Sequence, residues 1–68
     1  MEIVHNVKAD LLYIRLDQRK QDVVNRRLSD AVVLDIGEND TIVGIEILDA
    51  SKHLDLDGLL PVEFKLSR

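Results

Sequence analysis

The chain has 68 residues and a mass of 7.7 kDa, which suits one small domain and leaves no room for two. Hydrophobic residues make up 46% of it and charged residues 32%, a balance that excludes an intrinsically disordered chain. No apolar run approaches the roughly 18 residues of a membrane-spanning helix, and the absence of cysteine excludes disulfides and thiolate metal sites. The first residues show no basic region followed by an apolar stretch, so we expect no signal peptide and a cytoplasmic location.

Short β-prone segments follow one another from the amino terminus. In the run from Leu11 to Leu16, apolar side chains recur at alternate positions, which is typical of a strand. The expected strands are residues 1–5, 11–16, 23–28, 31–36 and 41–48. Connections of two to five polar residues join antiparallel neighbours, because a parallel crossover needs a dozen or more residues. The sequence therefore predicts an antiparallel β-meander over the first 48 residues.

The residues after this meander predict a short helix and one more strand. Asp49 is a typical N-cap residue, so we expect one or two helical turns that end near Leu54 or Leu56. Gly58 and Pro61 exclude a longer helix. The sequence Val-Glu-Phe-Lys-Leu at residues 62–66 alternates with period two and favours a strand. The predicted fold class is α+β: an antiparallel meander of four to five strands, one short helix and a C-terminal strand, in a single domain of residues 1–68.

The two faces of the predicted sheet differ in polarity. One is apolar throughout and should be buried as the core of the monomer; its central residues are Leu12, Ile14, Val32, Leu34, Val43 and Ile45. The other face has Arg15, Asp35 and Glu46 as its charged residues, and is otherwise more apolar than a solvated face should be. We expect a second copy of the chain to cover it. The predicted dimer interface consists of Leu11, Tyr13, Val33 and Ile42. In the alternative, the chain is a monomer whose segment from Leu54 to Leu66 folds back over this face.

Two residues have a direct structural interpretation. Gly44 lies inside the strongest predicted strand, where glycine indicates a β-bulge or the close approach of a bulky neighbour, such as Tyr13 across the sheet. Asp10 precedes a strand, where its carboxylate suits a turn in which it accepts hydrogen bonds from nearby backbone N–H groups.

The sequence offers no arrangement of residues typical of catalysis or of metal binding. Ser51 and His53 are two residues apart, so on a helix they would point away from each other, and no glycine-flanked nucleophile turn is present. Residues 55–58 (Asp-Leu-Asp-Gly) begin like a calcium loop but lack the later acidic ligand. Asp49, His53 and Asp57 would share a face only on a helix that continued to Gly58. We therefore expect no enzyme, no metal and no cofactor.

Basic residues gather early in the chain. Residues 1–27 carry six basic and four acidic side chains, whereas residues 28–68 carry three and nine. The cluster on one predicted hairpin consists of Arg15, Arg19, Lys20, Arg26 and Arg27. Such a ribbon suits contacts with phosphates or with a protein partner. The overall charge of −4 and the single aromatic residue of this region make nucleic acid the weaker interpretation.

Two longer segments carry a resemblance. Residues 7–16 read Val-Lys-Ala-Asp-Leu-Leu-Tyr-Ile-Arg-Leu, and residues 42–51 read Ile-Val-Gly-Ile-Glu-Ile-Leu-Asp-Ala-Ser, with Val-Val-Leu-Asp at 32–35 between them. With this pattern, residues 1–53 resemble a family of small bacterial and archaeal proteins catalogued only as a numbered domain of unknown function. Val7 and Lys8 depart from the acidic pair that commonly precedes Ala-Asp there. The resemblance implies a small cytoplasmic protein; in this family some members are encoded beside small toxins, which implies an antitoxin or accessory role.

These observations converge on a function class. We expect a non-catalytic protein–protein interaction module that forms a homodimer. The alternative is a nucleic-acid-binding regulator or antitoxin that uses the basic ribbon between Arg15 and Arg27.

Overall fold

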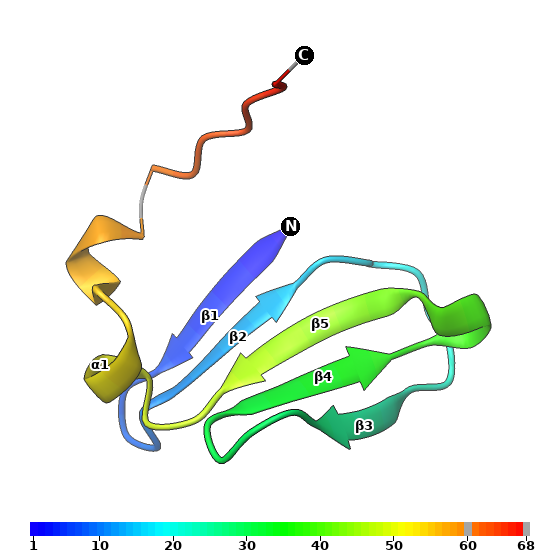
Figure 1. The fold of residues 1–68 in the computed structure, drawn as a ribbon, viewed down its shortest axis with the longest axis horizontal. Helices are drawn as coiled ribbons and strands as arrows, with labels where there is room; N and C mark the ends of the chain where they lie inside the picture. Colours follow the sequence, from blue (N-terminus) through cyan, green and yellow to red (C-terminus); the bar gives the residue numbers. More distant parts are fainter. Residues whose placement is uncertain (60, 68) are drawn as a thin grey trace.

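Five strands form one antiparallel sheet in the computed structural model, which describes residues 1–59 and 61–67 of the chain (Figure 1). Along the chain they are β1 (Glu2–Asn6), β2 (Leu11–Arg15), β3 (Val24–Arg27), β4 (Val32–Ile36) and β5 (Ile42–Ile47). Each lies within a residue or two of a strand that apolar alternation predicts, including the one at the amino terminus. The positions of the strands along the chain are therefore confirmed.

The strand order is β1-β2-β5-β4-β3, so the predicted meander is wrong as a topology. β3, β4 and β5 follow one another through hairpins, but β2 pairs with β5. Residues 16–23 pass the ends of β5 and β4 and enter β3 at the far edge (Figure 1), which is a Greek-key connection. Composition explains the order: the apolar β5 takes the centre, whereas β3, exposed at all four residues and carrying Arg26 and Arg27, suits an edge.

Three short helical turns complete the described fold: η1 (Glu38–Asp40), α1 (Ala50–His53) and η2 (Leu56–Gly58). In the β4–β5 turn, Asn39 and Asp40 adopt positive φ angles of 55° and 57°, which Asn and Asp tolerate better than most residues. Asp49 precedes α1 as predicted, but its side chain makes no capping hydrogen bond. The Asp10 carboxylate takes that role: it accepts from the Ser51 N–H, at 3.1 Å, and from the Ser51 hydroxyl, at 2.6 Å.

The C-terminal segment beyond η2 is not paired with the sheet. Residues 62–67 have no regular secondary structure, and they run away from the strands in Figure 1. The predicted C-terminal strand is therefore not formed within the single chain. Leu56 and Leu59 are half-buried, so only the first part of the segment 54–66 packs; Leu60, within that segment, lies outside the described residues.

The best-buried apolar residues lie near the ends of strands rather than in the middle of the sheet. Among the described hydrophobic residues, Leu12 and Val43 are 1% exposed and Ala50 is fully buried. The expectation of six buried core residues is thus confirmed for Leu12 and Val43 and is wrong for the other four. Those four, which are only half-buried, are Ile14, Val32, Leu34 and Ile45. The sheet is a single layer along most of its length, and that is why its central side chains stay partly open (Figure 1).

No helix in the part of the chain that the structure describes is long and apolar enough to span a membrane.

Candidate interaction surfaces

Cross-strand pairing gathers the aliphatic side chains on one side of the sheet, which we call the apolar face. Ile45 of the central strand lies opposite Ile14 on one side and Leu34 on the other. Ile47 in the same way lies between Leu12 and Val32. Paired residues point to the same side of a sheet. The apolar face therefore continues across β2, β5 and β4, and Ile3 of β1, opposite Ile14, extends it.

The solvent-exposed area of the chain is large for its mass. The single chain exposes 5571 Å² to solvent. A compact protein of this mass exposes about 4,300 Å², so the excess is roughly 1,200 Å². The C-terminal segment contributes to this excess, since Val62, Phe64 and Leu66 are 48%, 88% and 68% exposed. The protein thus has apolar surface that its own chain does not cover.

A groove of about 680 Å³ lies at one end of the apolar face. Ile3, His5 and Leu12 form its wall on the sheet. Leu56, Leu59 and Val62 form the wall on the C-terminal segment. The groove thus lies where the first strand and the last described segment of the chain meet.

The predicted dimer interface lies on the opposite side, which we call the tyrosine face. Tyr13, Glu46 and Val33 are consecutive partners across β2, β5 and β4, and Leu11 is on the same side of β2 as Tyr13. The register shift at Asp35 and Ile36 sets Ile42 opposite Ile36 instead, so Ile42 is separated from the other three. The structure therefore brings Leu11, Tyr13 and Val33 together and leaves out Ile42, because a bulge reverses the alternation that the sequence implies.

Gly44 provides the space in which the Tyr13 ring lies. A Cβ atom at Gly44 would lie 2.6 Å from Tyr13 Cζ and 2.8 Å from Cε1, far inside van der Waals contact. Gly44 also pairs with Asp35 at the register shift between β4 and β5. Both sequence interpretations of this glycine, a bulge and the close approach of Tyr13, are confirmed.

Two carboxyl groups meet on the tyrosine face. Asp35 is only 9% exposed, and its Oδ1 atom has no hydrogen-bond partner among the described residues. A hydrogen bond to Asp35, together with burial and the negative charge of Asp35, raises the pKa of Glu46. Burial and the same carboxylate raise the pKa of Tyr13. The alternation of the sequence already assigns Asp35 and Glu46 to the same face of the sheet as Tyr13, so this pair can be predicted from the sequence.

Glu46→Gln should change how stability depends on pH. A carboxyl group whose pKa is higher in the folded state stabilises fully below the unfolded pKa, near 4.5, and that contribution is lost as pH rises through the folded pKa. The Gln side chain does not titrate. The Tm difference, variant minus parent, should therefore grow more positive from about pH 4 to pH 7. Thermal melts across this range check it, with the exposed Glu38→Gln as control; parallel profiles for parent and Glu46→Gln would contradict the raised pKa of Glu46.

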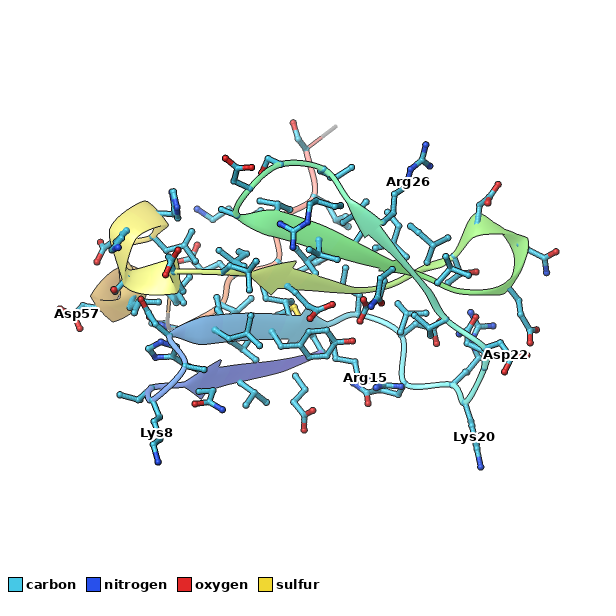
Figure 2. All side chains as sticks on the ribbon, turned by 90° about the horizontal axis from the view of Figure 1, so that it is seen from below. Lys8, Arg15, Lys20, Asp22, Arg26 and Asp57 are labelled. Atoms are coloured by element: carbon cyan, nitrogen blue, oxygen red, sulfur yellow. The ribbon has the colours of Figure 1, made fainter. Side chains whose placement is uncertain are left out.

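The basic residues of the predicted ribbon are dispersed in the structure. β2 and β3 do not form a hairpin, because β5 and β4 separate them. Arg26 lies opposite Leu34 and Arg27 opposite Val33, so the two side chains point to different faces. Figure 2 shows Lys20 and Arg26 pointing away from each other.

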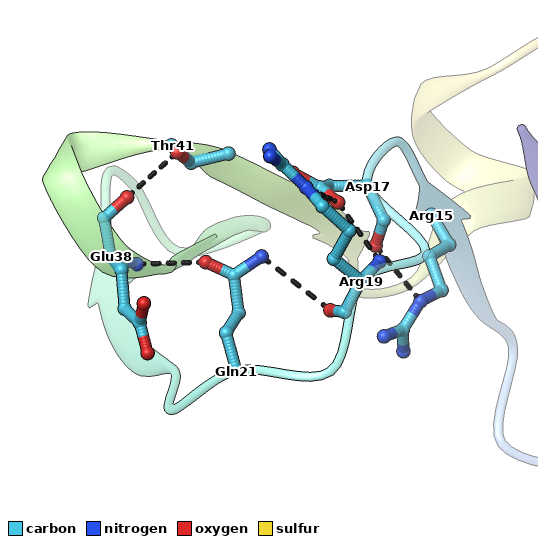
Figure 3. A network of polar contacts seen from close by, with 6 residues as sticks. All are labelled: Arg15, Asp17, Arg19, Gln21, Glu38 and Thr41. Carbon is cyan, nitrogen blue, oxygen red and sulfur yellow. Dashed lines mark hydrogen bonds and ion pairs between the residues drawn. The ribbon is translucent and has the colours of Figure 1, made fainter.

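The remaining arginines are engaged within their own loops. The Arg19 guanidinium donates to the Asp17 carboxylate, at 2.6 Å in its shortest contact, and lowers the pKa of Asp17 (Figure 3). Arg15 Nε donates to the Asp17 carbonyl at 3.1 Å. Arg27 donates to the carbonyl oxygens of Ser29 and Asp30. Nearby, the Gln21 side chain accepts from the Glu38 N–H and so ties residues 16–23 to the β4–β5 turn (Figure 3).

His5, Asp10 and Ser51 form a polar cluster that joins distant segments near the helix. His5 Nε2 lies 3.1 Å from Asp10 Oδ1, and the hydrogen bonds from Ser51 and from His5 lower the pKa of Asp10. Asp10 lies between the other two, whereas a nucleophilic triad needs the histidine between serine and carboxylate. The predicted turn role of Asp10 is thus replaced by a contact 41 residues away.

No group of three or more metal-ligating side chains occurs among residues 1–59 and 61–67. α1 ends at His53, so Asp49, His53 and Asp57 do not share a helix face.

These features define a small antiparallel β-sheet protein with one open apolar face and one mixed face. The family model described as "Protein of unknown function (DUF2283)" matches residues 7–51, and the chain belongs to this family. The match spans β2 to β5 and the start of α1, whereas β1 and the C-terminal segment lie outside it. The search of curated proteins finds no match, and neither does the search of solved structures.

Proposed function

We propose that this protein is a homodimeric protein–protein interaction module without catalytic activity, and that two copies pack their apolar faces together. One observation carries the proposal. Ile45 and Ile47 belong to the central strand of the sheet, yet both are only half-buried in the single chain. Central aliphatic residues of a complete domain are covered by a second layer. A second copy of the same sheet supplies that layer.

The area argument supports a partner of this size. A standard protein–protein interface buries about 800 Å² on each partner. The single chain exposes roughly 1,200 Å² more than a compact protein of its mass. A two-fold interface needs only one self-complementary patch, and the continuous aliphatic surface across β2, β5 and β4 is such a patch.

The apolar face suits this role better than the tyrosine face on which the sequence predicts the interface. Packing two tyrosine faces would bury Arg15 together with the Asp35 and Glu46 carboxyl groups. Burying charged groups costs several kcal/mol unless each finds a partner. On β2, β5 and β4 the apolar face carries only aliphatic side chains, and Arg26 lies at its margin on the edge strand β3.

Light scattering coupled to gel filtration tests the proposal. At micromolar concentrations we expect a species of twice the 7.7 kDa chain mass, unchanged by added DNA or RNA at low salt. A chain that stays monomeric at high concentration contradicts the homodimer. A nucleic-acid complex that survives physiological salt contradicts the module and favours the regulator or antitoxin instead.

A further inference from the structure

We propose that residues 62–66 form an exchange arm, which adds as an edge strand to β1 of the partner copy and places Phe64 in the partner's groove. This inference rests on the proposed homodimer. It explains why a segment with a clear strand pattern has no strand partner within its own chain.

The arm has the chemistry of an unpaired strand. Val62, Phe64 and Leu66 alternate with Glu63 and Lys65, and the apolar three are 48%, 88% and 68% exposed. Lys65 Nζ lies 2.9 Å from Glu63 Oε2, so the charged side chains interact with each other along the segment. An extended segment with one apolar side is stabilised most when its backbone forms hydrogen bonds with a sheet edge and its apolar side chains are buried.

β1 offers the matching receptor. Among the strands of residues 1–59 and 61–67 it pairs with β2 only, so its outer edge presents N–H and C=O groups without strand partners there. Its Ile3 and His5 side chains line the groove on the apolar face. An added strand with Val62, Phe64 and Leu66 on that side would extend the apolar face by one strand. Glu63 and Lys65, which pair with each other, would then lie on the side of β1 that carries Glu2.

The groove favours the arm of a second copy over the arm of its own chain. Val62 already forms part of the groove wall of its own chain. In an extended segment, residue i+2 lies about 6.6 Å further along the same side. Phe64 therefore lies beyond the groove that its own Val62 borders, and it is 88% exposed there. A two-fold axis that sets β1 of one copy over β1 of the other brings each arm to the partner's groove.

Disulfide trapping tests the exchange, because the chain has no native cysteine. We expect the double variant Ile3→Cys/Phe64→Cys to oxidise to a covalent dimer, seen on non-reducing electrophoresis, with the 3–64 linkage identified by mass spectrometry. Ile3→Cys/Lys65→Cys is the matched control, since residue 65 would face the other side and should cross-link several-fold less. A monomer with an internal 3–64 disulfide overturns the exchange, as does equal yield from both variants.

A second measurement remains informative if cross-linking perturbs the fold. Phe64→Asp in the full chain should dimerise at least tenfold more weakly in concentration-dependent light scattering, and Phe64→Ala should reproduce part of the loss. If both variants dimerise as strongly as the parent, the exchange arm is contradicted while the homodimer is not. A full-length chain that is monomeric overturns both.

Discussion

Leu34→Asp should abolish the homodimer, whereas Val33→Asp, its neighbour on β4, should leave it intact. Leu34 lies on the apolar face opposite Ile45 of the central strand, while Val33 lies opposite Glu46 on the tyrosine face. A carboxylate in a packed interface loses its hydration, and Arg26, opposite it on the edge strand β3, offsets only part of that cost. We expect at least a hundredfold loss of dimer affinity for Leu34→Asp, which corresponds to about 2.7 kcal/mol.

The matched pair keeps this result interpretable. Leu34 is only half-buried in the single chain, so an aspartate there can reach water in the monomer. The variant should therefore fold, with far-UV circular dichroism like that of the parent, and light scattering should report a monomer. If Val33→Asp gives the folded monomer and Leu34→Asp stays dimeric, the interface lies on the tyrosine face, as the sequence suggests.

Gly44→Val should destabilise the fold, although valine favours strands more than glycine does. A Cβ atom at this position would overlap the Tyr13 ring, which lies 2.6 Å away at Cζ. The ring would have to leave its place beside Asp35, where burial and that carboxylate raise the pKa of Tyr13. Overpacking of this kind costs about 1–3 kcal/mol, a large share of the stability of a domain this small.

A double-mutant cycle identifies the cause of the Gly44→Val effect. Tyr13→Ala removes the ring, so Gly44→Val in that background should cost little or even stabilise, through β-propensity. Urea unfolding of the four proteins gives the coupling free energy. A Gly44→Val protein as stable as the parent, or an equal loss in both backgrounds, would show that the ring and the glycine do not depend on each other.

Local patterns predict where the strands lie, but not how they are ordered. Alternation in residues 11–16 and 41–48 depends on neighbours two residues apart, and both strands form. The pairing of β2 with β5 depends on residues about 30 positions apart, and it places the arginine-bearing β3 at an edge. A meander is the simplest strand order when the loops are short. The connection of residues 16–23 is eight residues long, which is enough to carry the chain past β5 and β4 to the far edge of the sheet.

The candidate surfaces show the same limit. Gly44 and Tyr13 could be matched from the sequence, because a glycine inside a strand requires a large neighbour or a bulge. The capping of α1 by Asp10 could not, since nothing local connects Asp10 with Ser51. Ile42 was placed on the wrong face because one extra residue at the bulge reverses the alternation beyond it. The Val62–Leu66 pattern predicts a strand whose partner its own chain does not supply.

Thiol labelling at single introduced cysteines tests most directly whether the apolar face is the dimer interface. Leu34→Cys and Val33→Cys each provide one thiol in a chain that otherwise has none. As protein concentration rises through the dimer dissociation constant, the labelling rate at position 34 should fall at least tenfold, while that at position 33 stays constant. Protection at position 33 alone, or concentration-independent labelling at both positions, would contradict a homodimer built through the apolar face.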